Sequence, residues 1–139
     1  MVELLYRNNI HSLEDYVLWL KKRIRYQKET SGDIWQTPEE FLHTREGDCE
    51  DFTLLNAAVS RVLGFHPRIL ALTRPGGGHA ICAFQQGNVF IWFDNNRLRK
   101  SKASSLKEFA RHMISEYQYT ALLELDTRTN RWQRIDQNS

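Results

Sequence analysis

The chain has 139 residues, of which 41% are hydrophobic and 26% charged, and this length and composition are typical of one globular domain. With 19 basic and 17 acidic residues the formal net charge is +2, which is too small to indicate a nucleic-acid partner. No apolar stretch approaches the ~20 residues of a membrane-spanning helix, and the two cysteines are too few for a disulfide framework or a site of several thiolates.

Three helices are predicted in the N-terminal half. The first begins after Ser12, a residue type that caps helices, and apolar residues then recur at helical spacing. A polar loop is expected over Gln27–Asp33, and the capping sequence Thr37-Pro38-Glu39-Glu40 begins a short second helix. The third and main helix is expected from Cys49 to Leu63.

Strand patterns dominate the C-terminal half. Two loops are expected there, a flexible one at Pro75–Gly78 and a polar, basic one at Asn95–Ser104. Helices first and an antiparallel sheet second indicate an α+β fold, with N-terminal helices packed on an antiparallel sheet in a single domain over residues 1–139. The expected strands are Arg68–Thr73, His79–Phe84 and Val89–Asp94, followed by a helix at Ser105–Tyr117 and a hairpin formed by Tyr119–Leu125 and Arg131–Ile135.

The stretch Gly47-Asp48-Cys49-Glu50-Asp51 supplies the first candidate for chemistry. Asp48 is a good N-cap, and Asp51 stands three residues later, where its carboxylate can reach back to the cap. Cys49 then lies in the first turn of the main helix, where the dipole and the free N–H groups favour thiolate over thiol. We therefore expect Cys49 to be a nucleophile with a lowered pKa.

A predicted hairpin supplies a base and a group to orient it. If the turn lies at Gln86-Gly87, His79 and Asp94 are direct cross-strand partners that point to one face of the sheet. A carboxylate that hydrogen-bonds an imidazole fixes its tautomer and stabilises the imidazolium. Cys82 stands three residues from His79, so it should face the opposite side and act as a small core residue.

The order of these residues resembles the transglutaminase-like fold, a circularly rearranged relative of papain. The local segments resemble the bacterial transglutaminase-like cysteine proteinases more closely, and the resemblance covers about Ile24–Asn96. It implies that Cys49 is the nucleophile, His79 the base and Asp94 the orienting acid. The implied chemistry is acyl transfer, or hydrolysis of a peptide or glutamine-like amide, through a thioester. The segments are Trp35-Gln36-Thr37-Pro38-Glu39-Glu40, Gly47-Asp48-Cys49-Glu50-Asp51, His79-Ala80 and Phe93-Asp94-Asn95.

The oxyanion of such a reaction needs hydrogen-bond donors. The backbone N–H of Cys49 is expected to be one of them. Gln36, Trp35 and Tyr26 are candidates for the second donor, although core packing accounts for Trp35 equally well.

A calcium site is a further implication of the resemblance. In some bacterial relatives the acidic pair that flanks the cysteine binds calcium, which places the candidate site at Asp48 and Glu50, with Asp51 as a third oxygen ligand. The alternative is that these carboxylates only cap the helix. The chemistry itself requires no other cofactor.

Two functions therefore stand open. One is an enzyme, a cysteine peptidase or amidase or a transglutaminase-like acyltransferase that acts on a protein or peptide; the other is a non-catalytic binding module that retains the fold. The complete set of Cys49, His79 and Asp94 favours the enzyme, and neither a nucleic-acid nor a membrane partner is expected. Met1–Ile10 shows no signal-peptide pattern, which favours the cytoplasm, or the periplasm if an upstream segment was trimmed.

Overall fold

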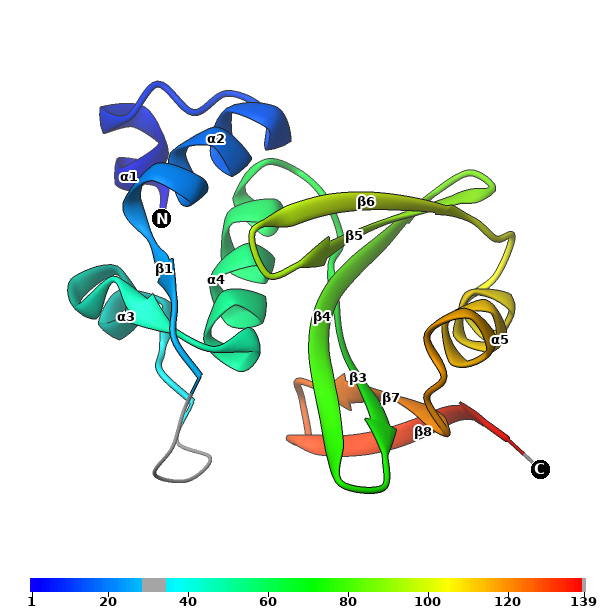
Figure 1. The fold of residues 1–139 in the computed structure, drawn as a ribbon. Coiled ribbons are helices and arrows are strands. Elements are labelled where there is room, and N and C mark those ends of the chain that lie inside the picture. The colour runs from blue at the N-terminus through cyan, green and yellow to red at the C-terminus, as the bar shows by residue number, and fades with distance from the viewer. Residues whose placement is uncertain (29–34, 139) are drawn as a thin grey trace.

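The computed structural model describes residues 1–28 and 35–138, and within them helices precede a sheet along most of the chain, as predicted (Figure 1). Most of the predicted loop Gln27–Asp33 lies outside the described residues. The N-terminal helices are α1 (Val2–Arg7), α2 (Leu13–Arg23), α3 (Pro38–Thr44) and α4 (Cys49–Val62).

The predicted helix starts are confirmed by their caps. The Ser12 hydroxyl accepts the N–H of Asp15 at 3.1 Å, and Thr37 and Glu40 form a reciprocal capping box at the start of α3. Helix α1 was not predicted. In the parts of the chain that the structure describes, no helix is both long and apolar enough to cross a membrane.

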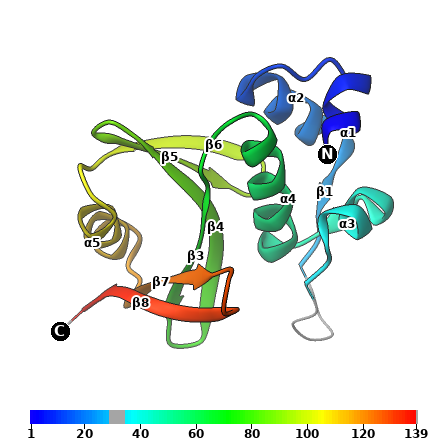
Figure 2. The same ribbon diagram turned by 180° about the vertical axis from the view of Figure 1, so that it is seen from behind.

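Two very short strands tie the helices together. Strands β1 (Arg25–Tyr26) and β2 (Glu46–Gly47) pair in parallel, with Tyr26 opposite Gly47. Because β2 directly precedes α4, this pairing places β1 beside the start of that helix (Figure 2). The sequence pattern placed Arg25 at the end of the first helix and predicted a turn at Glu46-Gly47, so neither strand was predicted.

The main sheet has six strands, all paired antiparallel, in the order β6-β5-β4-β3-β7-β8. Helix α5 (Leu106–Tyr117) lies between β6 and β7 in the chain. The α+β prediction is therefore confirmed. The strands are β3 (Arg68–Arg74), β4 (Gly77–Gln86), β5 (Val89–Asp94), β6 (Arg97–Lys102), β7 (Ala121–Asp126) and β8 (Arg131–Gln137).

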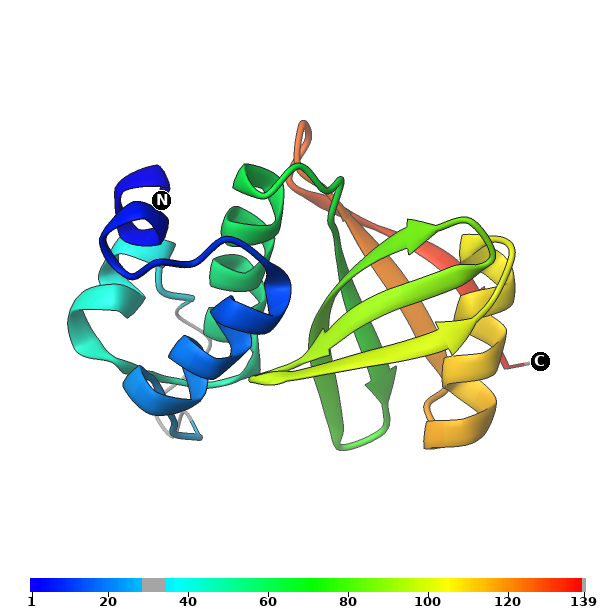
Figure 3. The ribbon, with the colours of Figure 1, turned by 90° about the horizontal axis from the view of Figure 1, so that it is seen from above.

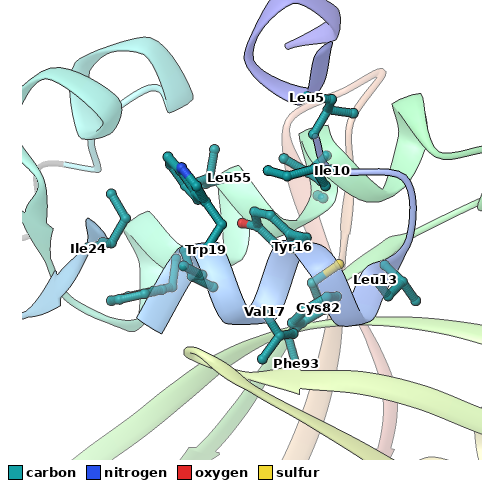
Figure 4. Packing of buried hydrophobic residues seen from close by; sticks show 14 of the residues in the cluster. Leu5, Ile10, Leu13, Tyr16, Val17, Trp19, Ile24, Leu55, Cys82 and Phe93 are labelled. Atoms are coloured by element: carbon teal, nitrogen blue, oxygen red, sulfur yellow. The ribbon is translucent and has the colours of Figure 1, made fainter. Parts of the chain in front are cut away.

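The sheet separates two hydrophobic cores. Helices α1 to α4 lie on one side and α5 on the other (Figure 3). Alternation along β4 divides its side chains between them: Cys82 packs in the core with α4, and Ile81 in the core with α5. Cys82 is fully buried close to Tyr16 and Phe93 (Figure 4), which confirms its prediction as a core residue.

Two loop predictions were wrong. The polar segment Asn95–Ser104 contains the edge strand β6, whose arginines and lysines are the charged side chains that protect an exposed sheet edge. The glycine segment is a tight hairpin turn at Pro75-Gly76, so β4 already begins at Gly77. At Gly78 a Cβ would lie 3.0 Å from the carbonyl oxygen of Leu72, so close pairing of β3 with β4 favours glycine there.

Candidate active site

Cys49 is the first residue of α4, as predicted. Asp48 is the N-cap, and its N–H donates to the Asp51 carboxylate at 3.1 Å in a capping box. A Cβ on Gly47 would lie 2.4 Å from an Asp51 oxygen and 2.7 Å from the Phe41 ring, so only glycine fits before the cap. The backbone N–H of Cys49 lies in the first turn, where helical N–H groups have no intrahelical partner.

Asp51 supports the start of α4 from within the protein. Its side chain is 1% exposed, and it accepts the backbone N–H of Gln36 at 2.7 Å and the Gln36 amide at 3.1 Å. The Gln36 amide also donates to the carbonyl of Glu46 at 2.9 Å. Both amide hydrogens are thereby used, so Gln36 has no side-chain donor to offer an oxyanion, and Asp51 is committed to the cap and loop rather than to a cation.

The other two oxyanion candidates lie in different places. The Trp35 ring contacts Trp132 of β8 edge to face, with ring centroids 6.1 Å apart. Tyr26 stacks on Phe52 of α4, and its pKa is raised first by burial and then by the charges of Cys49, Asp48 and Glu50. Tyr26 is therefore the candidate whose hydroxyl is electrostatically coupled to the Cys49 sulfur.

His79 and Asp94 form the predicted hydrogen bond. Nε2 of His79 lies 2.9 Å from Oδ1 of Asp94, and the side chains are 21% and 30% exposed. Arg99 donates from Nε to the other Asp94 oxygen at 3.2 Å. The His79 bond lowers the pKa of Asp94, and the charges of His79 and Arg99 also lower it against the effect of burial. An ionised Asp94 accepts from Nε2–H and leaves Nδ1 of His79 free to act as a base.

The hairpin register differs from the predicted one. Gln86 pairs with Val89 and Cys82 with Phe93, so the turn is Gly87-Asn88, where Gly87 has a φ of +61°. Moving the turn by one residue shifts every partner by two and preserves the face. His79 and Asp94 are therefore diagonal rather than direct neighbours, a separation that long side chains still bridge.

The Cys49 thiol lies beside β4 at Ala80, the residue that follows His79 in the chain. The backbone amide of Ala80 lies close enough to the sulfur to favour the thiolate, and the thiol donates to Glu50 with Sγ 3.5 Å from Oε2. Among the described residues no hydrogen bond links Cys49 to His79 directly. The thiol proton is therefore directed to Glu50 rather than to the imidazole.

The expected lowering of the Cys49 pKa was wrong. Burial raises the pKa of the thiol to about 12, the backbone amide of Ala80 opposes the rise, and the charges of Glu50 and Asp48 add to it. The helix dipole that the sequence argument invoked is outweighed because the sulfur is largely out of water and has two carboxyl groups beside it.

Asp48 and Glu50 form a carboxyl pair beside the thiol. Burial, followed by the hydrogen bond and charge of Glu50, raises the pKa of Asp48 to about 6. Two carboxyls in contact share a proton or are neutralised by a cation, so this pair suits a hard cation. No group of three or more His, Cys, Asp or Glu side chains with metal-binding geometry occurs in residues 1–28 and 35–138. The predicted set of Asp48, Glu50 and Asp51 is therefore not gathered into a three-ligand metal site in these residues.

Sequence reasoning missed two supporting residues. Arg99 was placed in a loop, although its spacing of five from Asp94 is reachable across a tight β5–β6 hairpin. Asn56 of α4 is 1% exposed; it accepts the Tyr16 hydroxyl at 2.7 Å and donates to the carbonyl of Asn95 at 2.9 Å. A lone asparagine on the inner face of a predicted helix was the available signal.

The fold and these side chains define a class of protein. Residues 6–137 match the family model described as the transglutaminase-like superfamily, and the chain belongs to that superfamily. No curated protein sequence matches the chain.

Proposed function

We propose that this protein is a thiol-dependent acyltransferase or hydrolase of peptide or glutamine-like amides, with a Cys49–His79–Asp94 triad. The observation that carries the proposal is the His79–Asp94 hydrogen bond of 2.9 Å, together with the position of Ala80, the residue after His79, beside the Cys49 sulfur. The family often contains a Cys-His-Asp triad, and the local segments resemble the bacterial transglutaminase-like cysteine proteinases.

Attack begins from a protonated thiol, because burial keeps the pKa of Cys49 at about 12. Nδ1 of His79, the nitrogen not bonded to Asp94, takes the proton as the sulfur attacks the amide carbonyl carbon. Asp94, fixed by Arg99, stabilises the imidazolium. Proton transfer concerted with attack avoids a free thiolate beside two carboxyl groups.

The tetrahedral intermediate carries its negative charge on the former carbonyl oxygen. The backbone N–H of Cys49 and the hydroxyl of Tyr26 are the donors we propose for it. The C–N bond then breaks, His79 returns the proton to the leaving amine, and a thioester remains on Cys49. Water completes hydrolysis, whereas a second amine completes transamidation. A calcium ion bound to Asp48 and Glu50 would neutralise the charges that oppose ionisation of the thiol.

The test is activity-based labelling with a panel of peptide and glutamine-amide electrophiles. Wild-type protein should label at Cys49, and Asp94→Asn should slow labelling by ~10²–10⁴-fold while leaving the fold intact. Asn95→Ala and Asn96→Ala serve as matched loop controls and should cost much less. If Asp94→Asn labels at the wild-type rate while Asn95→Ala or Asn96→Ala labels slowly, the substituted asparagine rather than Asp94 orients His79.

A non-catalytic binding module is the second candidate. Two observations favour it: the raised pKa of Cys49 and the absence of a direct Cys49–His79 hydrogen bond among the described residues. Failure of every electrophile in the panel to react with Cys49, at neutral pH with and without calcium, would support it.

A further inference from the structure

A pocket of about 260 Å³ opens on the α5 side of the His79–Asp94 pair. It is smaller than the ~300–1,000 Å³ of pockets that hold a whole drug-sized ligand, and it suits a single large side chain. It is lined by Leu72, His79, Trp92, Asp94, Met113, Tyr117 and Tyr119.

The floor of the pocket is apolar and fixed. Leu72 and Met113 are each 1% exposed and Trp92 is 3% exposed, so all three are anchored in the core that α5 covers. The Trp92 indole N–H donates to the hydroxyl of Ser101 at 3.1 Å, and its ring meets Tyr117 edge to face at 5.9 Å. Aromatic walls held in this way favour an aromatic guest through further edge-to-face contacts.

The charges around the pocket disfavour a cationic guest. The only carboxylate in its lining, Asp94, already accepts from His79 and Arg99. The guanidinium of Arg99 lies 5.7 Å from the Trp92 ring centroid, and that of Arg74 lies 5.0 Å from the ring centroid of Tyr119. A lysine or arginine side chain would therefore meet two positive groups and find no free acid.

The position of the pocket relative to the reaction decides which part of a substrate it meets. An imidazole that accepts the thiol proton returns it to the leaving amine, so the amine side of the scissile bond lies at His79. The oxyanion donors that we propose, Tyr26 and the N–H of Cys49, are not in the pocket lining. The pocket is lined by His79 and Asp94, so it lies toward the Nε2 end of the ring, and a side chain on an amine held at Nδ1 reaches it along the imidazole.

We propose that this pocket binds an aromatic side chain of the residue whose amine is expelled from the acyl carbon when the Cys49 thioester forms, and, in the reverse direction, of an amine that attacks that thioester. The proposal rests on the function proposed above. As the C–N bond breaks, the nitrogen takes the proton from the His79 imidazolium, and the released amine keeps its aromatic ring in the pocket until it departs. Tyr119 lies near both Asp94 and Cys49. Burial raises the pKa of Tyr119 most, the charge of Arg74 lowers it, and the charges of Asp94 and Cys49 raise it further.

The test measures binding without turnover. Cys49→Ala protein is titrated with L-phenylalaninamide and with glycinamide at pH 8.5, and the Trp92 indole N–H resonance, assigned through Trp92→Phe, is followed by NMR. Phenylalaninamide should shift the resonance saturably and glycinamide should not. Tyr117→Ala should weaken binding at least tenfold and Tyr117→Phe should retain it, whereas Tyr6→Ala, at an exposed position on α1, should leave it unchanged.

Two outcomes would overturn the pocket: equal shifts with the two amides, or unaltered phenylalaninamide binding in a folded Tyr117→Ala variant. The proposed function fails separately, through the absence of Cys49 labelling in wild-type protein. If wild-type protein labels at Cys49 but cleaves peptides or accepts amines at the same rate with and without an aromatic side chain on the amine, the proposed function holds and the pocket has no part in it.

Discussion

Glu50 should suppress the reactivity of Cys49, and Glu50→Gln should release it. The thiol sulfur lies 3.5 Å from a Glu50 oxygen. At that separation two unit negative charges repel by about 1 kcal/mol with the dielectric constant of water and by about 5 kcal/mol with an effective value near 20. Since 1.36 kcal/mol corresponds to one pKa unit and burial is the larger cause of the raised pKa, removing the charge should lower the Cys49 pKa by about one unit.

The rate gain is smaller than the gain in thiolate. Nucleophilicity falls with pKa at a Brønsted slope of about 0.4–0.5, which leaves an acceleration of roughly 3- to 4-fold at a pH below both pKa values. The assay is alkylation by iodoacetamide at pH 7.5, with Cys49 and Cys82 resolved by mass spectrometry. Cys82 is fully buried, so its rate reports unfolding rather than local reactivity.

Glu39→Gln is the matched control, because Glu39 is an exposed acid in the first turn of α3. It should change neither rate. An unchanged or slower Cys49 rate in a stably folded Glu50→Gln variant would refute the electrostatic argument, and so would equal acceleration by Glu39→Gln. Parallel acceleration at Cys82 would trace the effect to unfolding.

Three further predictions concern the supports of the site. Millimolar calcium should raise the Tm of the wild type but not of Asp48→Asn, since a ligand of the native state stabilises it; no rise relative to chelator would leave Asp48 and Glu50 as capping residues. Without calcium, the folded-state pKa of Asp48, about 6, lies above its unfolded value, so its stabilising contribution is full below about pH 4 and is lost as pH rises through 6. In urea titrations Asp48→Asn should therefore raise the free energy of unfolding by about 1 kcal/mol at pH 7.5 after solvent screening, and not at pH 4; a constant difference would contradict this. Asn56→Ala should lower the free energy of unfolding by roughly 2–3 kcal/mol, because the Tyr16 hydroxyl and the Asn95 carbonyl lose their partner. A loss below about 0.5 kcal/mol would show that water replaces the amide.

The parts of the fold that local chemistry decides were predictable. Ser12, Thr37 and Asp48 mark helix starts because a cap depends only on residues within one turn. The shared face of His79 and Asp94 was predicted even though the turn was placed one residue early, because parity survives such a shift.

The parts that depend on tertiary contacts were not. The pattern of β6 reads as a loop, because an edge strand carries charge on both faces and has no hydrophobic alternation. The position of Cys49 at a helix start is a local feature, whereas the pKa of its thiol is set mainly by burial, which only the packing of α4 on the sheet determines. The parallel pairing of Arg25 with Glu46 joins residues that no short-range pattern connects.

Because side chains alternate along β4, the two halves of the proposed site are supported by different hydrophobic cores. Cys49 starts a helix packed in the core that contains Cys82, while His79 points to the side of the sheet where α5 packs. A cavity made beneath α4 should therefore displace the nucleophile and spare the base, and one made beneath α5 should do the reverse. Alignment of the reacting atoms would then be sensitive to substitutions in either core, well away from any group that takes part in the chemistry. The same separation would let the helix side and the α5 side change independently, so that one could adjust the thiol while the other adjusts the choice of amine.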